Sequence, residues 1–306
     1  MTEKQKTLRK EIKLEGKGLH SGTIVEITIN PADPDFGYKF KRTDLENQPI
    51  IRAIASNVVS TSRGTTLQEN GAQVMTIEHL CAALFGMDID NALIEISGSE
   101  IPILDGSSKP FIEEIEKVGI VEQNAERKYY QIEEKITYSD GNGIELAVYP
   151  DDEFSIDVHI DYNSKVLGFQ YASIKNISQF KDEIASCKTF VFLHELEFLA
   201  KNNLIKGGDL DNALVIIDKP MSQEELDHLA DLFNKPKINV RPEGILNNTK
   251  LLYQNEPARH KLLDIIGDLS LIGTRIKGKV IATKPGHHSN TELAKKLQQI
   301  INNNKS

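Results

Sequence analysis

Residues 257–269 read PARHKLLDIIGDL, in which His260, Asp264 and Asp268 recur at every fourth position among leucines and isoleucines. In an α-helix successive residues are about 100° apart, so these three polar side chains form one stripe beside an apolar face. A histidine and a carboxylate at positions i and i+4 can bind one metal ion, as ligand pairs do in zinc hydrolases. A hydrogen-bonded pair on a solvated surface is the alternative, because so short a motif often occurs by chance.

A second candidate lies in TIEHLCAAL (76–84), where Glu78 and His79 stand side by side in an otherwise apolar segment. A buried glutamate is unfavourable unless it is paired or used in function. Alternatively, both residues occupy a first helical turn, where glutamate interacts favourably with the helix dipole. A catalytic zinc takes three protein ligands and one open position for water. If His79 joins His260 and Asp264, Glu78 lies beside that water and can accept its proton.

A third histidine, His287, follows Pro285 and Gly286, and we expect it in a tight loop after a strand. Loops that follow rigid strands often carry catalytic residues. There His287 can donate a proton to a leaving amine, with Asp268 holding its imidazole; an ordinary surface histidine is the alternative. Three further histidines have no identifiable partners and are interpreted as structural, namely His159, His194 and His228.

The segments that must position these residues mix strands with helices. A period of two predicts strands at 22–31, 37–45, 91–98, 129–139, 143–150, 153–162, 212–218 and 277–283. Helical patterns predict helices at 76–87, with Thr76 as N-cap and Gly86 as stop, and at 107–120, 178–185, 193–203, 222–233, 257–269 and 290–304. Strands joined by short turns favour an α+β fold over a doubly wound parallel sheet.

The length of 306 residues predicts two domains, and the polar segment 121–128 is the candidate boundary between 1–124 and 125–306. A net charge of −9 argues against nucleic-acid binding, which needs a basic surface. The sequence has no secretory signal and no apolar run of about 20 residues, so we expect no membrane anchor. Cys81 and Cys187 are far apart and form no disulfide framework, which fits the cytoplasm. We expect a monomer.

Several stretches, taken together and in order, resemble one family. They are GKGLHSG (16–22), MTIEHLCAAL (75–84), EIPILDGSSKPF (100–111), KTFVF (188–192), RHKLLDIIGDL (259–269) and KPGH (284–287). The set is similar to the UDP-3-O-acyl-N-acetylglucosamine deacetylases, zinc amidases that commit a sugar to lipid A in Gram-negative bacteria. The resemblance implies two α+β domains of similar topology, each a layered sandwich of sheet and helices, with the active site at their interface.

The resemblance also implies the chemistry of the site. It implies Zn2+ held by His79, His260 and Asp264, with Glu78 as the general base that activates water. It implies His287 as the positively charged acid that protonates the leaving amine. The substrate would be a UDP-linked, 3-O-acylated N-acetylglucosamine, from which acetate is released.

Further roles follow from the same resemblance. Asp268 would orient the catalytic histidine, and the Thr189 hydroxyl would stabilise the tetrahedral oxyanion. Phe190 would line the substrate pocket, Lys261 would meet the anionic nucleotide, and His20 would lie near the site. The family holds the acyl chain in an apolar passage, for which our candidates are Leu196, Ile205, Gly208, Leu210, Ala213 and Val215. An ordinary core would have the same composition as this passage.

Two positions depart from the family pattern. Lys188 stands where members often have arginine, which keeps the charge but loses bidentate geometry. The turn at 139–145 lacks the lysine that some members use to contact substrate. Two alternative functions stay open: a zinc amidase acting on another acylated amino-sugar, and a non-catalytic module that binds nucleotide-sugars.

Overall fold

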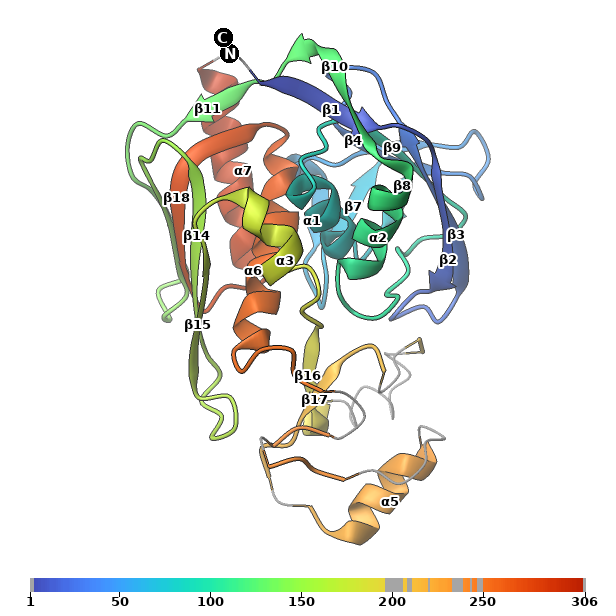
Figure 1. The fold of residues 1–306 in the computed structure, drawn as a ribbon, viewed down its shortest axis with the longest axis vertical. Coiled ribbons are helices and arrows are strands. Elements are labelled where there is room, and N and C mark those ends of the chain that lie inside the picture. Colours follow the sequence, from blue (N-terminus) through green and yellow to red (C-terminus); the bar gives the residue numbers. More distant parts are fainter. Residues whose placement is uncertain are drawn as a thin grey trace.

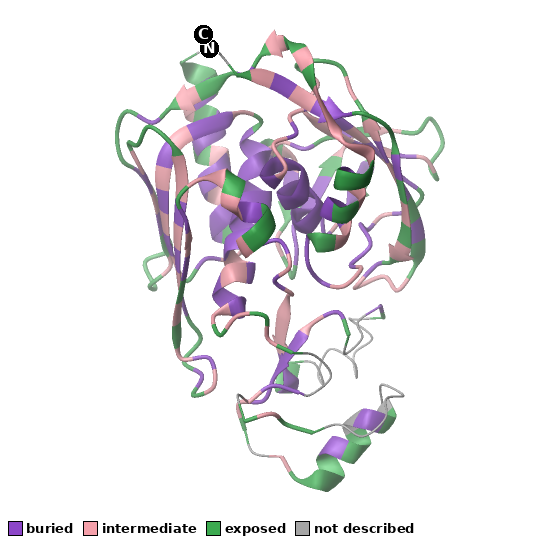
Figure 2. Cartoon of the chain, viewed as in Figure 1, coloured by how far each residue is buried: buried purple, intermediate pink, exposed green. Residues whose placement is uncertain are grey.

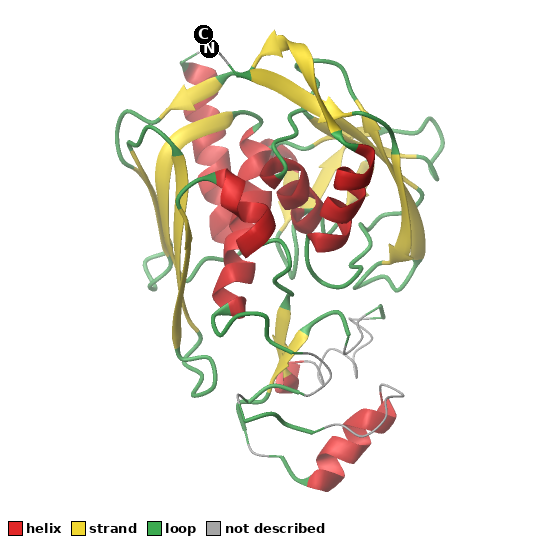
Figure 3. Cartoon of the chain, in the orientation of Figure 1, coloured by secondary structure: helices red, strands yellow, loops and turns green. Residues whose placement is uncertain are grey.

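The computed structural model describes residues 3–195, 206–207, 211–219, 221–232, 239–242, 244–246 and 250–304. Strands gather in separate sheets, and in this view the drawn helices other than α5 (Gln223–Leu232) lie between the two larger sheets (Figures 1 and 3). The mixed order of strands and helices confirms the predicted α+β class. In the part of the chain that the structure describes, we find no helix long and apolar enough to cross a membrane.

Two sheets share one pattern of strand order and direction. The first runs β2-β3-β9-β4-β5, and the second runs β12-β13-β18-β14-β15 with β11 also paired to β18. Along each of these orders, one internal pair is parallel (β4 with β9, β14 with β18) and the other neighbours are antiparallel. The additional strand β11 runs parallel to β18. The strands of the first sheet are β2 (Ile12–Lys17), β3 (Ile24–Pro31), β4 (Tyr38–Arg42), β5 (Ile50–Arg52) and β9 (Ala92–Ile96). Those of the second are β11 (Tyr129–Gln131), β12 (Ile136–Ser139), β13 (Glu145–Tyr149), β14 (Phe154–Asp161), β15 (Phe169–Ile174) and β18 (Arg275–Thr283).

Helices occupy equivalent places in the two halves of the chain. The α-helices of the described residues are α1 (Glu78–Gly86), α2 (Lys109–Val118), α3 (Phe180–Glu183), α5 (Gln223–Leu232), α6 (Glu256–Leu269) and α7 (His287–Asn303). Thus α1 and α2 flank β9 along the chain as α6 and α7 flank β18. The equivalent helices α1 and α6 pack directly against each other. One continuous cluster of buried apolar side chains runs through both halves, and α1 and α6 lie in the buried centre (Figure 2).

The smaller sheets complete the strand pairing. Their strands are β1 (Lys4–Leu8) with β10 (Ile120–Glu126), β6 (Val58–Ser60) with β7 (Thr66–Glu69) and β8 (Ala72–Val74), and the parallel pair β16 (Phe190–Phe192) and β17 (Leu214–Ile216). Strand β10 occupies most of the segment 121–128 that we interpreted as a domain boundary, and it pairs with β1. The connection between the halves is therefore a paired strand. The division into 1–124 and 125–306 stays a prediction.

The predicted helix at 257–269 is confirmed as α6, and its polar stripe is not solvated. Pro257 lies in the first turn, where its missing N–H is not needed. His260 and Asp264 are each 1% exposed and Asp268 is 0% exposed, because α6 packs against α1, α7, β14 and β15. A surface stripe is thereby excluded as the explanation of the four-residue spacing.

Two local predictions about helix ends were wrong. Thr76 is not the N-cap of α1: Ile77 holds that position, the φ of Thr76 is +57°, and its hydroxyl donates to Glu100 Oε1 and accepts no N–H of the helix. His287 does not lie in a loop, since it is the first residue of α7, with Gly286 as the extended residue before the helix. At the start of α5, Ser222 and Glu225 form a capping box: the backbone N–H of Ser222 donates to the Glu225 carboxylate at 2.7 Å, and the Ser222 hydroxyl accepts the backbone N–H of Glu225 at 3.3 Å.

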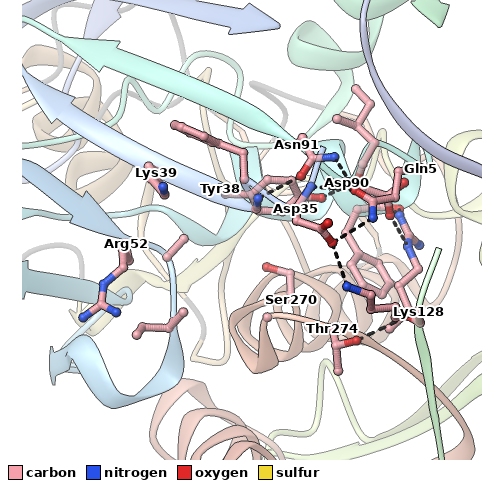
Figure 4. Close-up of a pocket in the computed structure, with 18 of the residues that line it drawn as sticks. Gln5, Asp35, Tyr38, Lys39, Arg52, Asp90, Asn91, Lys128, Ser270 and Thr274 are labelled. Carbon is pink, nitrogen blue, oxygen red and sulfur yellow. Dashed lines mark hydrogen bonds and ion pairs between the residues drawn. The ribbon is translucent and has the colours of Figure 1, made fainter. Parts of the chain in front are cut away.

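A cavity of about 300 Å³, with both charged and apolar side chains in its wall, lies where α1 and α6 end (Figure 4). Phe85 comes from the end of α1 and Ser270 from just beyond α6. Arg275 donates to the carbonyls of Phe85 and Ile89, each at 3.2 Å, and its Nε lies 3.2 Å from Asp90 Oδ1. A cation is favourable at a helix C-terminus, so Arg275 ties the end of α1 to the start of β18.

The contact between α1 and α6 depends on Gly267. A Cβ atom at this position would lie 2.2 Å from the carbonyl oxygen of Glu78, which is backbone and cannot rotate away. We predict that Gly267→Ala pushes the helices apart and lowers the free energy of unfolding by about 1–3 kcal/mol, as overpacking does. Urea unfolding followed by circular dichroism measures this change. A variant with the stability of the wild type would contradict the close helix contact.

Candidate functional site

His79, His260 and Asp264 come together where α1 crosses α6. One possible ligand atom from each of the three lies within 4.8 Å of the others. Asp264 Oδ1 is 3.4 Å from His260 Nε2 and 3.8 Å from His79 Nε2. Bonds of about 2.0–2.2 Å to one ion place neighbouring ligand atoms roughly this far apart. The three predicted ligands are thus gathered, all buried, on two helices that the topology makes equivalent.

The donors are also in the right chemical state for a metal ion. Burial lowers the pKa of His260, and burial together with His260 lowers the pKa of His79 to about 3, so both imidazoles are neutral at pH 7. His260 Nδ1 lies 3.0 Å from the carbonyl of Cys187, which fixes the N–H there and leaves the Nε2 lone pair facing Asp264. No described residue donates a hydrogen bond to the buried Asp264 Oδ1. A buried carboxylate oxygen of this kind fits a metal ligand.

Lys261 compensates the charge of Asp264. Burial acts to raise the pKa of Asp264, but the ammonium of Lys261 and the surrounding imidazoles outweigh it and hold that pKa well below its usual range. Lys261 Nζ lies 2.7 Å from Asp264 Oδ2 and 5.6 Å from the ring centre of Phe190. The predicted nucleotide-binding lysine therefore lies at the site, where its charge pairs with a candidate ligand.

Glu78 is a buried carboxylate beside the three donors, 3% exposed. Burial raises its pKa to about 7, Asp268 and Asp264 add to the rise, and His287 opposes it. Its Oε2 accepts a hydrogen bond from the backbone N–H of Thr65 at 3.0 Å. A carboxylate with a pKa near neutral is matched to the work of a general base.

His287 faces this carboxylate from the first turn of α7. Its Nε2 is 4.0 Å from both Glu78 Oε1 and Asp264 Oδ2, and its Nδ1 is 3.0 Å from Asp268 Oδ2. Burial acts against the charged imidazole, but the carboxylates of Asp268, Asp264 and Glu78 outweigh it and raise the pKa to about 9. At neutral pH His287 is therefore a protonated imidazole, and its contact with Asp268 is the one that the sequence predicts.

These groups open onto a cavity of about 510 Å³. Of the predicted substrate-binding and oxyanion residues, those on its wall are His20, Thr189, Phe190, Lys261, Ala213 and Val215. The remaining candidates for the acyl passage lie outside the described residues, namely Leu196, Ile205, Gly208 and Leu210. His194, which we interpreted as structural, also lines the cavity, and its Nδ1 is 3.5 Å from Asp218 Oδ1.

Sequence reasoning missed several residues that hold the site together. Thr65 contacts Glu78 and Asp268, and Asn290 Nδ2 donates to Asp268 Oδ2 at 2.9 Å. Asn290 is three residues after His287 on α7, so helical spacing was a usable signal. Thr65 gave no such signal, because it precedes a short strand and meets its partners only through the fold.

Glu100 is another missed residue, and it shapes the cavity wall. Its side chain is fully buried at 0% exposure and accepts hydrogen bonds from the backbone N–H groups of His20 at 2.9 Å and Ser21 at 2.8 Å. It also accepts the hydroxyl of Thr76 at 3.1 Å. One carboxylate therefore holds the loop that carries His20 against the residues that precede α1.

The site combines a gathered His₂Asp donor set, a buried carboxylate with a pKa near neutral and a protonated imidazole. This is the set of groups found in metal-dependent hydrolases. The family model described as "LpxC: UDP-3-O-acyl N-acetylglycosamine deacetylase" matches residues 5–238 and 234–299 of the chain. The chain belongs to this family.

Curated relatives agree with the family match. The "Bifunctional enzyme LpxC/FabZ" of Porphyromonas gingivalis is 50% identical over 99% of this chain and 66% of its own length. The protein of the same name from Bacteroides thetaiotaomicron is 48% identical over 97% of this chain and 65% of its own length. The "UDP-3-O-acyl-N-acetylglucosamine deacetylase" of Teredinibacter turnerae is 39% identical over 97% of this chain and 90% of its own length. The chain thus spans slightly less than two thirds of the two bifunctional relatives.

We predict that Asp264→Ala weakens the binding of a divalent ion by more than about 100-fold, because loss of an outer partner alone typically costs 10–100-fold. Equilibrium dialysis with Zn2+ as the probe ion, followed by elemental analysis, measures the affinity. Asp161→Ala is the matched control, since Asp161 is an exposed carboxylate paired with Lys284 at 3.1 Å. Equal affinity in Asp264→Ala and the control would rule out the donor set.

Proposed function

We propose that the chain is a zinc-dependent deacetylase that hydrolyses the N-acetyl group of a UDP-linked, 3-O-acylated N-acetylglucosamine, the committed step of lipid A biosynthesis. Water adds to the acetyl carbon, the C–N bond breaks, and acetate and a free amine are released. One observation carries the proposal: the neutral His79 and His260 and the ionised Asp264 lie beside Glu78 and a protonated His287. The match of the chain to this family supports the choice of substrate.

The donor set fits Zn2+, because zinc binds histidine and carboxylate ligands and a catalytic zinc site uses three protein ligands. His79, His260 and Asp264 would hold the ion. When bound, zinc supplies a Lewis acid that makes water more acidic and polarises the amide carbonyl.

The acid and the base are separate residues in this proposal. Glu78 is ionised above a pH of about 7 and accepts the proton of the attacking water through Oε1, since Oε2 is held by Thr65. His287 carries its proton on Nε2 toward the same space and donates it to the leaving nitrogen. Asp268 holds the imidazole at Nδ1 and stabilises its charge. Thr189, on the wall of the cavity, would donate its hydroxyl to the oxyanion.

Substrate binding would use the rest of the cavity. Phe190 and His20 would line it, and Lys261 would draw the anionic nucleotide, which explains how an acidic protein binds a diphosphate. Ala213 and Val215 supply apolar surface for the acyl chain. The remaining passage candidates, in the undescribed part of 193–215, stay a prediction.

Domain organisation and cellular location belong to the same proposal. The repeated strand order of the two larger sheets supports domains 1–124 and 125–306, with α1 and α6 facing each other across their junction. Cys81 and Cys187 are both buried and free, which fits a reducing cytoplasm. The monomeric state stays a prediction.

Two alternative functions are distinguishable by experiment. A module that only binds nucleotide-sugars needs neither a base with a raised pKa nor a protonated acid, so Glu78 and His287 count against it. A zinc amidase acting on another acylated amino-sugar would use the same groups. Acetate release from substrates with and without the acyl chain or the nucleotide separates that alternative from the proposed substrate.

We predict that removal of metal by a chelator abolishes acetate release and that Zn2+ restores it. Glu78→Gln should retain metal yet lose activity by roughly 10²–10⁴-fold, the usual contribution of general acid–base catalysis. Acetate release and zinc content, measured on the same samples, test both statements. Full activity in the presence of the chelator, or normal turnover in Glu78→Gln, would refute the mechanism.

We predict that the rate of acetate release has a bell-shaped dependence on pH. Activity requires ionised Glu78, whose pKa is raised, so it is lost as the pH falls through about 7. It also requires protonated His287, whose pKa is raised to about 9, so it is lost as the pH rises through that value. A bound cation lowers both pKa values, which moves both limbs to lower pH. His287→Gln should remove the alkaline limb, and an unchanged limb in this variant would assign it to another group.

A further inference from the structure

Thr65 touches both carboxylates that serve the acid and the base of the proposed reaction. Its backbone N–H donates to Glu78 Oε2 at 3.0 Å, and its hydroxyl donates to Asp268 Oδ1 at 2.6 Å. The residue is 0% exposed. One buried residue therefore bridges α1 and α6 through the two side chains that flank His287.

The oxygens that Thr65 binds are the ones that the chemistry does not use. Glu78 Oε1 and Asp268 Oδ2 face His287, at 4.0 Å from Nε2 and 3.0 Å from Nδ1. Thr65 holds the opposite oxygen of each carboxylate. A carboxylate fixed at one oxygen has its other oxygen fixed in direction as well, because the group is planar.

The backbone around Thr65 can come close to the Glu78 carboxylate. A Cβ at the preceding residue, Gly64, would lie 3.0 Å from Glu78 Oε1, so glycine leaves room for the carboxylate. The carbonyl of Thr65 accepts the N–H of Ile77 at 3.4 Å, one residue before Glu78. Thr66 then begins β7, which is paired on both sides by β6 and β8.

We infer that Thr65 is a positioning residue that sets the directions of Glu78 and Asp268, and through Asp268 the orientation of the His287 imidazole. Asn290 shares the second task, because it donates to the same Asp268 oxygen that His287 contacts. This inference rests on the proposed function, since it assigns Thr65 to the acid–base pair of that reaction. Thr65 itself makes no contact with the three candidate metal ligands among the hydrogen bonds of the described residues.

The hydroxyl is the part of Thr65 whose removal is informative. Without the hydroxyl, Asp268 Oδ1 would be a buried acceptor without this donor, which is unfavourable. The carboxylate would then rotate toward another hydrogen-bond donor. The backbone bond to Glu78 would be kept, and valine would fill the same volume. A change in Thr65→Val therefore reports on Asp268 and His287 and leaves the packing intact.

The experiment compares Thr65→Val with Thr65→Ser, which restores the hydroxyl, and with Thr66→Val, because the Thr66 hydroxyl makes no hydrogen bond to Glu78 or Asp268 in the described part of the chain. All are measured as zinc-loaded protein for kcat, KM and zinc content. We expect kcat to fall roughly 10–100-fold in Thr65→Val, as for other residues that orient a functional group. KM and zinc content should stay within about twofold, and Thr65→Ser and Thr66→Val should match the wild type in all three.

A second readout does not depend on activity. The NMR signal of the His287 Nδ1 proton, identified by its loss in His287→Gln, reports the hydrogen bond to Asp268. It should shift or broaden in Thr65→Val and return in Thr65→Ser. If Thr65→Val does not fold, Thr65→Ala replaces it in both measurements.

The outcomes test the positioning role of Thr65 separately from the proposed function. An unchanged kcat and an unchanged His287 signal in Thr65→Val would overturn the positioning role even when the wild type is active. An equal loss in Thr65→Ser would also overturn it, because the hydroxyl would then not be the cause. Absence of acetate release from the wild type would refute the proposed function, whereas the NMR comparison would still decide whether Thr65 positions His287.

Discussion

The close contact of α1 with α6 is the constraint on which the rest of the structure depends. At Gly267 the two backbones approach so closely that no Cβ fits between α6 and the carbonyl of Glu78. This contact places Glu78 and His79 opposite His260 and Asp264, so the donors from two distant parts of the sequence share one space. The equivalent positions of α1 and α6 in two similarly ordered sheets explain why two such helices are available to pack face to face.

Packing these helices at the centre buries several charges, and the site is arranged so that each charge has a partner. Asp264 is compensated by Lys261, and Asp268 is paired with His287. A buried charge without a partner would cost several kcal/mol, so removal of one member leaves the other unfavourable. The same burial sets the working pKa values, because desolvation raises that of Glu78 while nearby carboxylates raise that of His287. The protonation states that the proposed base and the proposed acid require therefore arise from a shared environment.

The sequence predicted the parts that follow from periodicity and motif spacing. The α+β class, the helix at 257–269 and the gathering of His79, His260 and Asp264 are present in the structure. It did not predict that the polar stripe of α6 is fully buried, since one helix gives no information on what covers it. Thr76 is not the N-cap that the sequence predicted, and its hydroxyl instead donates to Glu100, a partner brought close by the tertiary fold. Thr65 was invisible because its contacts join residues 13 and 203 positions away.

These failures share one physical cause, which is the difference between residues on the two central helices and residues outside them. Residues on the two helices that carry the candidate metal ligands follow repeating patterns, because helical geometry fixes which side chains face one direction. Thr65 and Glu100 lie outside those helices, in or next to short strands and turns, where hydrogen-bond partners are set by the approach of distant segments. Thr65 donates to two buried carboxylates, and Glu100 is itself a buried carboxylate that accepts hydrogen bonds from two backbone N–H groups and the Thr76 hydroxyl. A buried carboxylate is more costly when one of its donors is missing. The reactive groups can thus be read along the helices, while the groups that fix their directions emerge only from the fold.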